Sequence, residues 1–422
     1  MSSEHPKCNT PEISSAKSIG VEQRINFVQS ICHALLFLLI FFAIFDPGNR
    51  LFGLKYLLFV LFIIGGILAN KKMPINFSLI LYIALFSFFI PLFSIYMGQL
   101  FPDIGFSPPP QPLLYWPGFL FLILALFLSR NDMYDFFRKA FILSLTLLAF
   151  LVIGLFFLAK TGLHDFLSQF GVQRGMFWIF QRDYGGIQFP MIYYTSSPLF
   201  IISLSYWSFK CIDDFKMSSM LFFMITFIAL FLSGTRNSMI LAFFIPYVIF
   251  LFFSKKRMLF FTLGVIFAIG LSIKLSAVFS DMFSASNTSN AIKLGYLSDY
   301  SLVFNNSWHN IVFGQGLGTF FWVTPYHQYV STTELSYFEI FRMFGVFLGG
   351  LMILMYLMPL YYLWRTKDRS LKYLLVGYLG YLYISILNPY IFSSNGMLVL
   401  SFILATIFFK IKKIKIKESS DI

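Results

Sequence analysis

The chain has 422 residues, of which 58% are apolar and only 12% are charged, and phenylalanine alone occurs 58 times. This composition excludes an ordinary soluble protein, which has more polar surface to cover, and indicates a polytopic membrane protein. The formal net charge is +13. In a membrane protein such an excess usually reflects orientation, because lysine and arginine collect on the cytoplasmic side, so no nucleic-acid partner is expected.

The first segment, 1–26, is polar and contains neither the apolar core nor the small-residue cleavage site of a signal peptide. We therefore expect a cytoplasmic amino-terminal tail followed by a first span that itself targets the chain. The three cysteines (Cys8, Cys32 and Cys211) fall in this tail, in the first span and in an inner loop. Structural disulfides are therefore not expected.

Twelve apolar stretches approach the roughly 20 residues that a helix needs to cross a bilayer. They lie near 27–45, 51–69, 75–97, 113–129, 140–159, 189–209, 217–233, 238–254, 258–274, 338–364, 373–390 and 397–411. With the amino terminus inside, most of the 31 lysines and arginines fall in inner segments, as the positive-inside rule requires. The sequence thus predicts an all-α polytopic membrane protein with a transmembrane domain over 27–411, about 12 transmembrane helices, cytoplasmic termini and a basic tail at 412–422.

Three longer outer loops are expected, at about 98–112, 160–188 and 275–337, the last and largest lying between the ninth and tenth spans. The first is rich in proline and predicts a stiff cap without chemistry of its own. Apart from Lys55 near one end of its span, the centres of the predicted spans carry no charge. Ion-coupled transporters usually keep charged groups at membrane depth, so this pattern favours a catalyst or binder that works at the outer leaflet.

Arginines stand out at two outer positions. FLSGTRNSMI (231–240) joins two spans by a short turn and leaves Arg236 at the membrane edge, where its planar fork of donors suits a phosphate or diphosphate. Snorkelling to lipid headgroups is an equal alternative. In the second loop, Arg174 and Arg182 surround an aromatic run, which indicates either anion and sugar binding or an interfacial aromatic belt.

The third loop ends in a group of reactive side chains. His327, Glu334, Glu339 and Arg342 approach the outer end of the tenth span, and Glu339 and Arg342 are three residues apart, so they share a helix face. A carboxylate or imidazole near a phosphate-binding arginine can act as a general base for an acceptor hydroxyl. For His327 taken alone, an ordinary hydrogen-bonded loop histidine is the simpler interpretation, and Lys293 is a weaker candidate.

Two kinds of site are not expected. The glycine-rich stretch NIVFGQGLGTFF (310–321) lacks the spacing and context of a dinucleotide-binding fingerprint and fits a tight turn at an interface better. The sequence contains no HExxH motif and no cysteine–histidine cluster, so neither a metal site nor a cofactor is expected.

The combination of features resembles a known family. Twelve spans, an SGTR arginine at the outer end of the seventh, a large outer loop after the ninth, a GxGxGxF stretch at 314–320 and a following histidine are similar to the O-antigen polymerase and O-antigen ligase superfamily of bacterial envelope synthesis. The resemblance implies a metal-independent glycosyltransferase of the bacterial inner membrane, with its active site facing the periplasm. Its substrate would be an undecaprenyl diphosphate-linked oligosaccharide in the lipid bilayer, and the resemblance leaves room for a chain-length regulator protein as a partner.

By position, Arg236 matches the SGTR arginine and His327 the loop histidine, although Gln328 follows where asparagine is common. Lys293 stands where many relatives have arginine. Arg174 and Gly185 fit one arginine–glycine spacing described for polymerases, whereas no arginine lies between Arg257 and Arg342 to begin a second.

The stretch ELSYFEIFRMFG (334–345) favours a polymerase, which transfers the growing chain from undecaprenyl diphosphate to a lipid-linked repeat unit. The alternatives are a ligase, which transfers it to lipid A–core, and a lipid-linked oligosaccharide transporter, although the spans are too apolar to line a polar cavity. The implied mechanism is that Arg236, with Arg174 or Arg182, neutralises the leaving diphosphate, while His327 or Glu339 takes the proton of the acceptor hydroxyl. Arg342, Lys293 and Glu334 would bind or orient substrate groups.

Overall fold

The computed structural model describes residues 12–69, 76–101, 108–129, 131–161, 163–184, 187–266 and 288–420, with side chains at 27–69, 76–101, 108–129, 133–161, 163–181, 190–266 and 290–409. Helices make up 78% of the structure. In these ranges six helices are long and apolar enough to cross a membrane: Phe27–Phe45, Phe77–Leu100, Met133–Ala159, Arg236–Phe253, Ser336–Arg365 and Arg369–Leu387. The protein is therefore a predominantly helical, multi-pass membrane protein.

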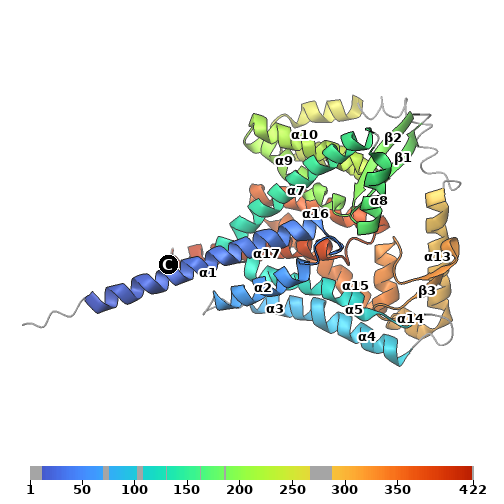
Figure 1. Cartoon of the computed structure of the whole chain (residues 1–422), viewed down its shortest axis with the longest axis horizontal. Coiled ribbons are helices and arrows are strands. Elements are labelled where there is room, and N and C mark those ends of the chain that lie inside the picture. Colours follow the sequence, from blue (N-terminus) through green and yellow to red (C-terminus); the bar gives the residue numbers. More distant parts are fainter. Residues whose placement is uncertain are drawn as a thin grey trace, which may run out of the picture.

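The first half of the chain is almost entirely helical up to a β-hairpin (Figure 1). Its helices are α1 (Glu12–Phe45), α2 (Lys55–Leu68), α3 (Phe77–Ile83), α4 (Ile90–Leu100), α5 (Pro112–Leu120), α6 (Leu124–Leu128), α7 (Asn131–Ala159) and α8 (His164–Arg174). A π-helical turn joins α3 to α4, and a 3-10 turn joins α5 to α6, so each pair forms one continuous helix. The hairpin consists of β1 (Phe177–Tyr184) and β2 (Ile187–Tyr194), which pair antiparallel.

The second half contains α9 (Phe200–Asp213), α10 (Met217–Leu232), α11 (Arg236–Phe253), a helix at Arg257–Ile266, α13 (Thr288–Asn306), α14 (Trp308–Val312), β3 (Phe321–Val323), β4 (Gln328–Val330), α15 (Ser336–Arg365), α16 (Lys372–Ile384) and α17 (Ser394–Ser420). The strands β3 and β4 form a second, short hairpin. Helices α9 and α16 pack closely because Gly377 and Gly380 let Ile202 and Ile201 of α9 approach the α16 backbone.

The twelve predicted spans are not all present as long helices. Six correspond to the long helices above and five to shorter apolar helices of 10–17 residues. The stretch predicted at 189–209 is wrong at its beginning, since residues up to Tyr194 belong to β2 and α9 starts only at Phe200. A short apolar, aromatic run fits a buried strand as well as a helix, and periodicity alone cannot separate the two.

The loops predicted at 160–188 and 275–337 consist largely of regular elements, among them strands that the all-α prediction did not contain. The former holds α8, β1 and the first two residues of β2, and α13, α14 and the second hairpin make up most of the latter; residues 267–287 lie outside the description. Part of each predicted tail is helical, because α1 begins at Glu12 and α17 continues to Ser420.

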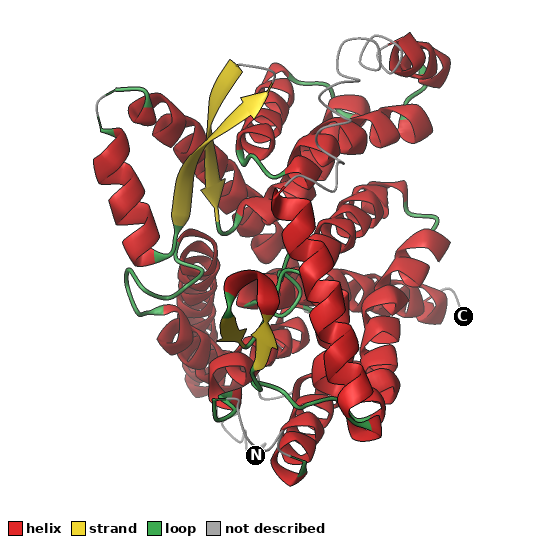
Figure 2. Ribbon diagram, turned by 90° about the vertical axis from the view of Figure 1, so that its right-hand side faces the viewer, coloured by secondary structure: helices red, strands yellow, loops and turns green. Residues whose placement is uncertain are grey.

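Both hairpins, α8, α13 and α14 lie at one end of the molecule, on the right of Figure 1, whereas α1 starts and α17 ends at the other. Figure 2, which looks onto the first of these ends, shows the long hairpin to one side and the short hairpin nearer the centre. The segments that carry the predicted site residues are therefore gathered at the end of the helical bundle remote from the chain ends.

Candidate functional site

Helix α15 is broken at Gly345, whose backbone (φ 69°, ψ −178°) is not helical. The first segment, Ser336–Phe344, carries Glu339 and Arg342. The break leaves carbonyl groups without partners inside the helix, and side and main chains from elsewhere bind them: Gln315 N donates to Arg342 O (2.6 Å), and Ser94 Oγ donates to Met343 O (2.6 Å). The glycine-rich turn after α14 is thus joined directly to the broken helix.

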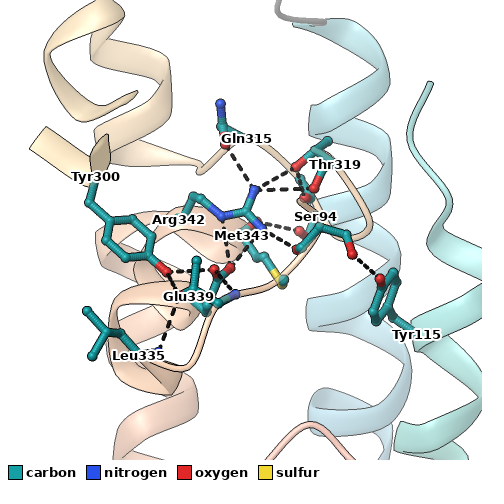
Figure 3. Close-up of polar contacts among 12 residues, drawn as sticks. Ser94, Tyr115, Tyr300, Gln315, Thr319, Leu335, Glu339, Arg342 and Met343 are labelled. Atoms are coloured by element: carbon teal, nitrogen blue, oxygen red, sulfur yellow. Dashed lines mark hydrogen bonds and ion pairs between the residues drawn. The ribbon is translucent and has the colours of Figure 1, made fainter. Parts of the chain in front are cut away.

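Glu339 and Arg342 form an ion pair whose side chains are both 0% exposed, with Arg342 Nη2 2.7 Å from Glu339 Oε2. Arg342 Nε donates to the same oxygen at 2.8 Å. The other oxygen, Oε1, accepts a hydrogen bond from the Tyr300 hydroxyl (2.6 Å), as Figure 3 shows. It also accepts one from Thr333 N (2.8 Å). Both oxygens of this carboxylate are therefore occupied by protein groups.

The remaining donors of Arg342 are also used. Nη1 donates to Gln315 Oε1 (3.0 Å) and Thr319 Oγ1 (3.1 Å), and Nη2 donates to Ser331 O (2.7 Å). The guanidinium carbon lies 4.5 Å from the centre of the Phe321 ring. Because these bonds compensate the cost of burying a charge, the pair can be stable in the interior. In this arrangement Glu339 and Arg342 join four segments and do not face solvent.

The ion pair fixes the loop Ser331–Leu335 in place. Arg342 donates to Ser331 O, and Glu339 accepts from Thr333 N. The Tyr115 hydroxyl, from α5, also bonds to Ser331 Oγ. Directly after Thr333, Glu334 turns outward, with its side chain 46% exposed. Lys293 Nζ, from α13, lies 3.7 Å from Glu334 Oε2. The fixed loop therefore presents an accessible carboxylate beside an ammonium group.

Arg236 is brought to the same region from a different part of the chain. Gly234 has a left-handed backbone (φ 71°), and a Cβ there would lie 2.6 Å from Met191 Cβ of the long hairpin. Thr235 then caps α11 by accepting a hydrogen bond from Ser238 N (3.2 Å), which places Arg236 at the first helical position. The turn is thus fixed at its cap and packed against the hairpin.

Arg236 Nη1 donates to Asn290 Oδ1 (3.2 Å) on α13. Asn290 and Lys293 are three residues apart on this helix and so share a face. Arg236, Lys293 and Glu334, separated by up to 98 positions in the sequence, thereby form one series of polar neighbours. We refer to Arg236, Asn290, Lys293 and Glu334 as the outer polar row.

His327 lies at the tip of the short hairpin, with a left-handed backbone (φ 49°) and an exposed side chain. Its imidazole, 6.5 Å from the Trp322 ring, makes no side-chain hydrogen bond to the part of the chain that the structure describes. The ring of the preceding Tyr326 packs at 6.1 Å against Tyr296, one helical turn after Lys293 on α13. The histidine tip and the outer polar row are therefore supported by the same helix.

Asp299 fixes the short hairpin to α13, because its buried carboxylate accepts hydrogen bonds from Thr324 N (2.9 Å) and Thr324 Oγ1 (2.6 Å). We predict that Asp299→Ala loosens the turn before His327, since a hydrogen bond to a charged carboxylate contributes about 1.5–3 kcal/mol and the variant loses both bonds to Thr324. Hydrogen exchange at the Thr324 amide should become faster. Asp165→Ala, at an exposed aspartate of α8, is the control, and equal protection in both variants would contradict the assignment.

The other predicted arginines lie elsewhere or cannot be placed. Arg174 is exposed in the last turn of α8, and the next residue, Gly175, adjoins the guanidinium of Arg50. Arg182 pairs with Phe189 in the long hairpin, but its side chain lies outside the description. Their roles in substrate binding stay predictions.

Sequence reasoning did not single out Asn290, Tyr300, Gln315 or Thr333. Of these, only Gln315 had a local signal, its place inside the glycine-rich turn. Over the described ranges, no group of three or more histidine, cysteine, aspartate and glutamate side chains lies close enough to hold a metal ion.

No protein-family model, no curated protein and no solved structure matches this chain. The chemistry of the outer polar row and of the buried ion pair is therefore inferred from their geometry and charge.

Proposed function

We propose that this protein is an O-antigen polymerase, a glycosyltransferase that moves a growing glycan from undecaprenyl diphosphate to a lipid-linked repeat unit at the periplasmic face of a bacterial inner membrane. The observation that carries the proposal is the outer polar row, in which the Arg236–Asn290 bond and the Lys293–Glu334 pair both involve α13, at the end of the molecule remote from the chain ends. These residues come from the segments whose motifs resemble the family.

The row has the charges that such a reaction requires. A diphosphate leaving group gains negative charge as the glycosidic bond breaks, and fixed cations stabilise that charge. Arg236 offers a planar fork of donors and Lys293 a point charge. Arg236 also stands at the amino-terminal, positive end of the α11 dipole, which favours an anion further.

The proton of the acceptor hydroxyl needs an accessible base. Both oxygens of Glu339 are already bonded and its side chain is 0% exposed, so we assign Glu339 and Arg342 to positioning the loop Ser331–Leu335. His327 and Glu334 are the accessible groups, and we propose one of them as the base. The acceptor oxygen would attack the anomeric carbon, the bond to the diphosphate oxygen would break, and the base would keep the proton.

Arg236→Ala tests the proposal in cells of the source organism that lack the chromosomal gene. Loss of the donor fork should lower polymerisation by a factor on the order of 100 or more, so that extracted lipopolysaccharide shows lipid A–core with a single repeat unit. Arg257→Ala, at an exposed arginine of a predicted inner turn, is the matched control and should restore the full ladder.

Two outcomes would contradict the proposal. A normal ladder with Arg236→Ala, at equal protein level, removes the arginine from the mechanism. Lipid A–core without any repeat unit in the deletion strain, together with long lipid-linked chains, identifies a ligase instead.

A further inference from the structure

A second loop is bonded to the start of α15, directly after Glu334. Ser336, two residues after Glu334, donates through Oγ to Asn388 O in the loop between α16 and α17. Tyr390 follows in that loop, and its carbonyl accepts a hydrogen bond from the Tyr381 hydroxyl of α16 (3.2 Å). The loops that carry Glu334 and Tyr390 are therefore held next to each other by bonds that use neither functional side chain.

The long hairpin contacts the loop that carries Tyr390. The hydroxyl groups of Tyr390 and of Tyr193, on β2, are 2.6 Å apart. Trp178, on β1, is the residue directly opposite Tyr193, with ring centres 5.7 Å apart and 38% of its surface exposed. An indole and two phenol hydroxyls thus meet at this point, and Glu334 lies near enough for its charge to act on both phenols.

The two phenol hydroxyls do not use all their donors and acceptors on each other. Each phenol has one proton and two lone pairs, and the contact between Tyr193 and Tyr390 uses a single proton. Over the described ranges, the second proton has no acceptor within the protein. Burial, with the charge of Glu334 adding to it, raises the pKa of Tyr193 to about 12 and that of Tyr390 well above its usual value. Both phenols therefore keep their protons at physiological pH and stay hydrogen-bond donors.

We infer that Glu334, Tyr193, Tyr390 and Trp178 form a binding subsite for a neutral saccharide ring. Sugar hydroxyls both donate and accept, so they suit a carboxylate beside a phenol with a free proton. The exposed indole offers an apolar surface on which the C–H face of a pyranose can stack. A phosphate does not suit this position, because Glu334 would repel it.

This inference rests on the proposed function and makes it more specific. In the outer polar row, Arg236 and Lys293 supply positive charge and Glu334 supplies a carboxylate. The neighbouring Tyr193–Tyr390 pair adds uncharged donors. A sugar joined to a diphosphate likewise has an anionic part, which suits the cations, and a neutral hydroxyl-bearing part, which suits the uncharged donors and the carboxylate. Arg236 and Lys293 would therefore bind the diphosphate, while Glu334 and the tyrosine pair bind the sugar attached to it.

The test uses the purified full-length protein in detergent and two probes. One is the repeat-unit oligosaccharide released from its lipid, without phosphate; the other is undecaprenyl diphosphate, without sugar. The double variant Tyr193→Phe/Tyr390→Phe keeps both rings and removes both hydroxyls. Titration calorimetry should show about tenfold weaker oligosaccharide binding, as expected for the loss of one or two hydrogen bonds, and unchanged binding of undecaprenyl diphosphate. Tyr383→Phe, at an exposed tyrosine of α16, is the control.

Glu334→Gln is a second variant, which leaves Tyr193 and Tyr390 unchanged. It should weaken binding of the oligosaccharide to the same extent, and it tests the subsite even if the double variant is unstable. Wild-type affinity for the oligosaccharide in these variants overturns the subsite, and so does a wild-type protein that binds only the carrier. If the variants lose oligosaccharide affinity but deletion of the gene leaves the lipopolysaccharide ladder unchanged, the subsite stands and the polymerase proposal fails.

Discussion

Arg342→Met is expected to lower the free energy of unfolding by about 3–5 kcal/mol, because it leaves the Glu339 carboxylate buried without its counter-ion. The carboxylate, 0% exposed, would keep only the bonds from Tyr300 and Thr333. Ser331 O and Gln315 Oε1 would also lose their donor. The measurement is thermal unfolding of the purified protein in one detergent.

The control for this prediction lies on the same helix. Arg365 is exposed at the far end of α15, where its guanidinium lies over the Tyr361 ring, so Arg365→Met should change stability little. The double variant Glu339→Leu/Arg342→Met should cost less than the sum of its single changes, since neither charge is then left alone. A fully stable Arg342→Met protein that makes no polymer would show instead that Arg342 acts on the substrate.

The second large effect is expected for Gly345→Ala. The backbone of Gly345 is nearly exclusive to glycine (φ 69°, ψ −178°), and a Cβ there would collide with Val312 and come within 2.6 Å of Phe313 N. We expect a loss of roughly 3 kcal/mol or more, since both strain and a backbone clash must be relieved. The displaced turn would also pull Gln315 away from Arg342.

Gly350→Ala is the matched control, because this glycine lies in the same helix and a Cβ there would meet nothing within 4 Å. That change should be neutral or stabilise by up to about 1 kcal/mol, since alanine is the better helix former. Thermal unfolding of both proteins compares them directly. Similar unfolding temperatures for the two variants would mean that the break in α15 is not required by the fold.

The membrane character of the chain could be read from its composition and from the spacing of apolar stretches, because burial in hydrocarbon requires apolar side chains over a whole span. Six of the predicted spans are long helices in the structure. Near Tyr193 the same reasoning was wrong, because an aromatic run serves a strand as well as a helix. Only pairing with β1 decided that this segment is a strand.

For the candidate site, the spacing of Glu339 and Arg342 predicted a shared helix face, and the ion pair confirms it. The sequence could not tell whether that face points to solvent or to the interior. This depends on Tyr300, Gln315 and Thr333, which lie 6 to 42 positions away from the pair and satisfy its hydrogen bonds. Without those partners the same two residues would have to remain in water.

By itself, then, the sequence determined that the protein is built from apolar helices and that Arg236, Lys293, His327 and Glu334 are reactive groups at the ends of these helices or in the segments between them. The tertiary structure alone decided that Arg236 bonds to Asn290 on the helix that carries Lys293, and that Glu334 faces outward from a loop held by a buried ion pair. The physical reason is the separation along the sequence over which each interaction acts. Hydropathy acts residue by residue and is visible in any window of the chain, whereas hydrogen bonds between distant segments exist only after the helices have packed.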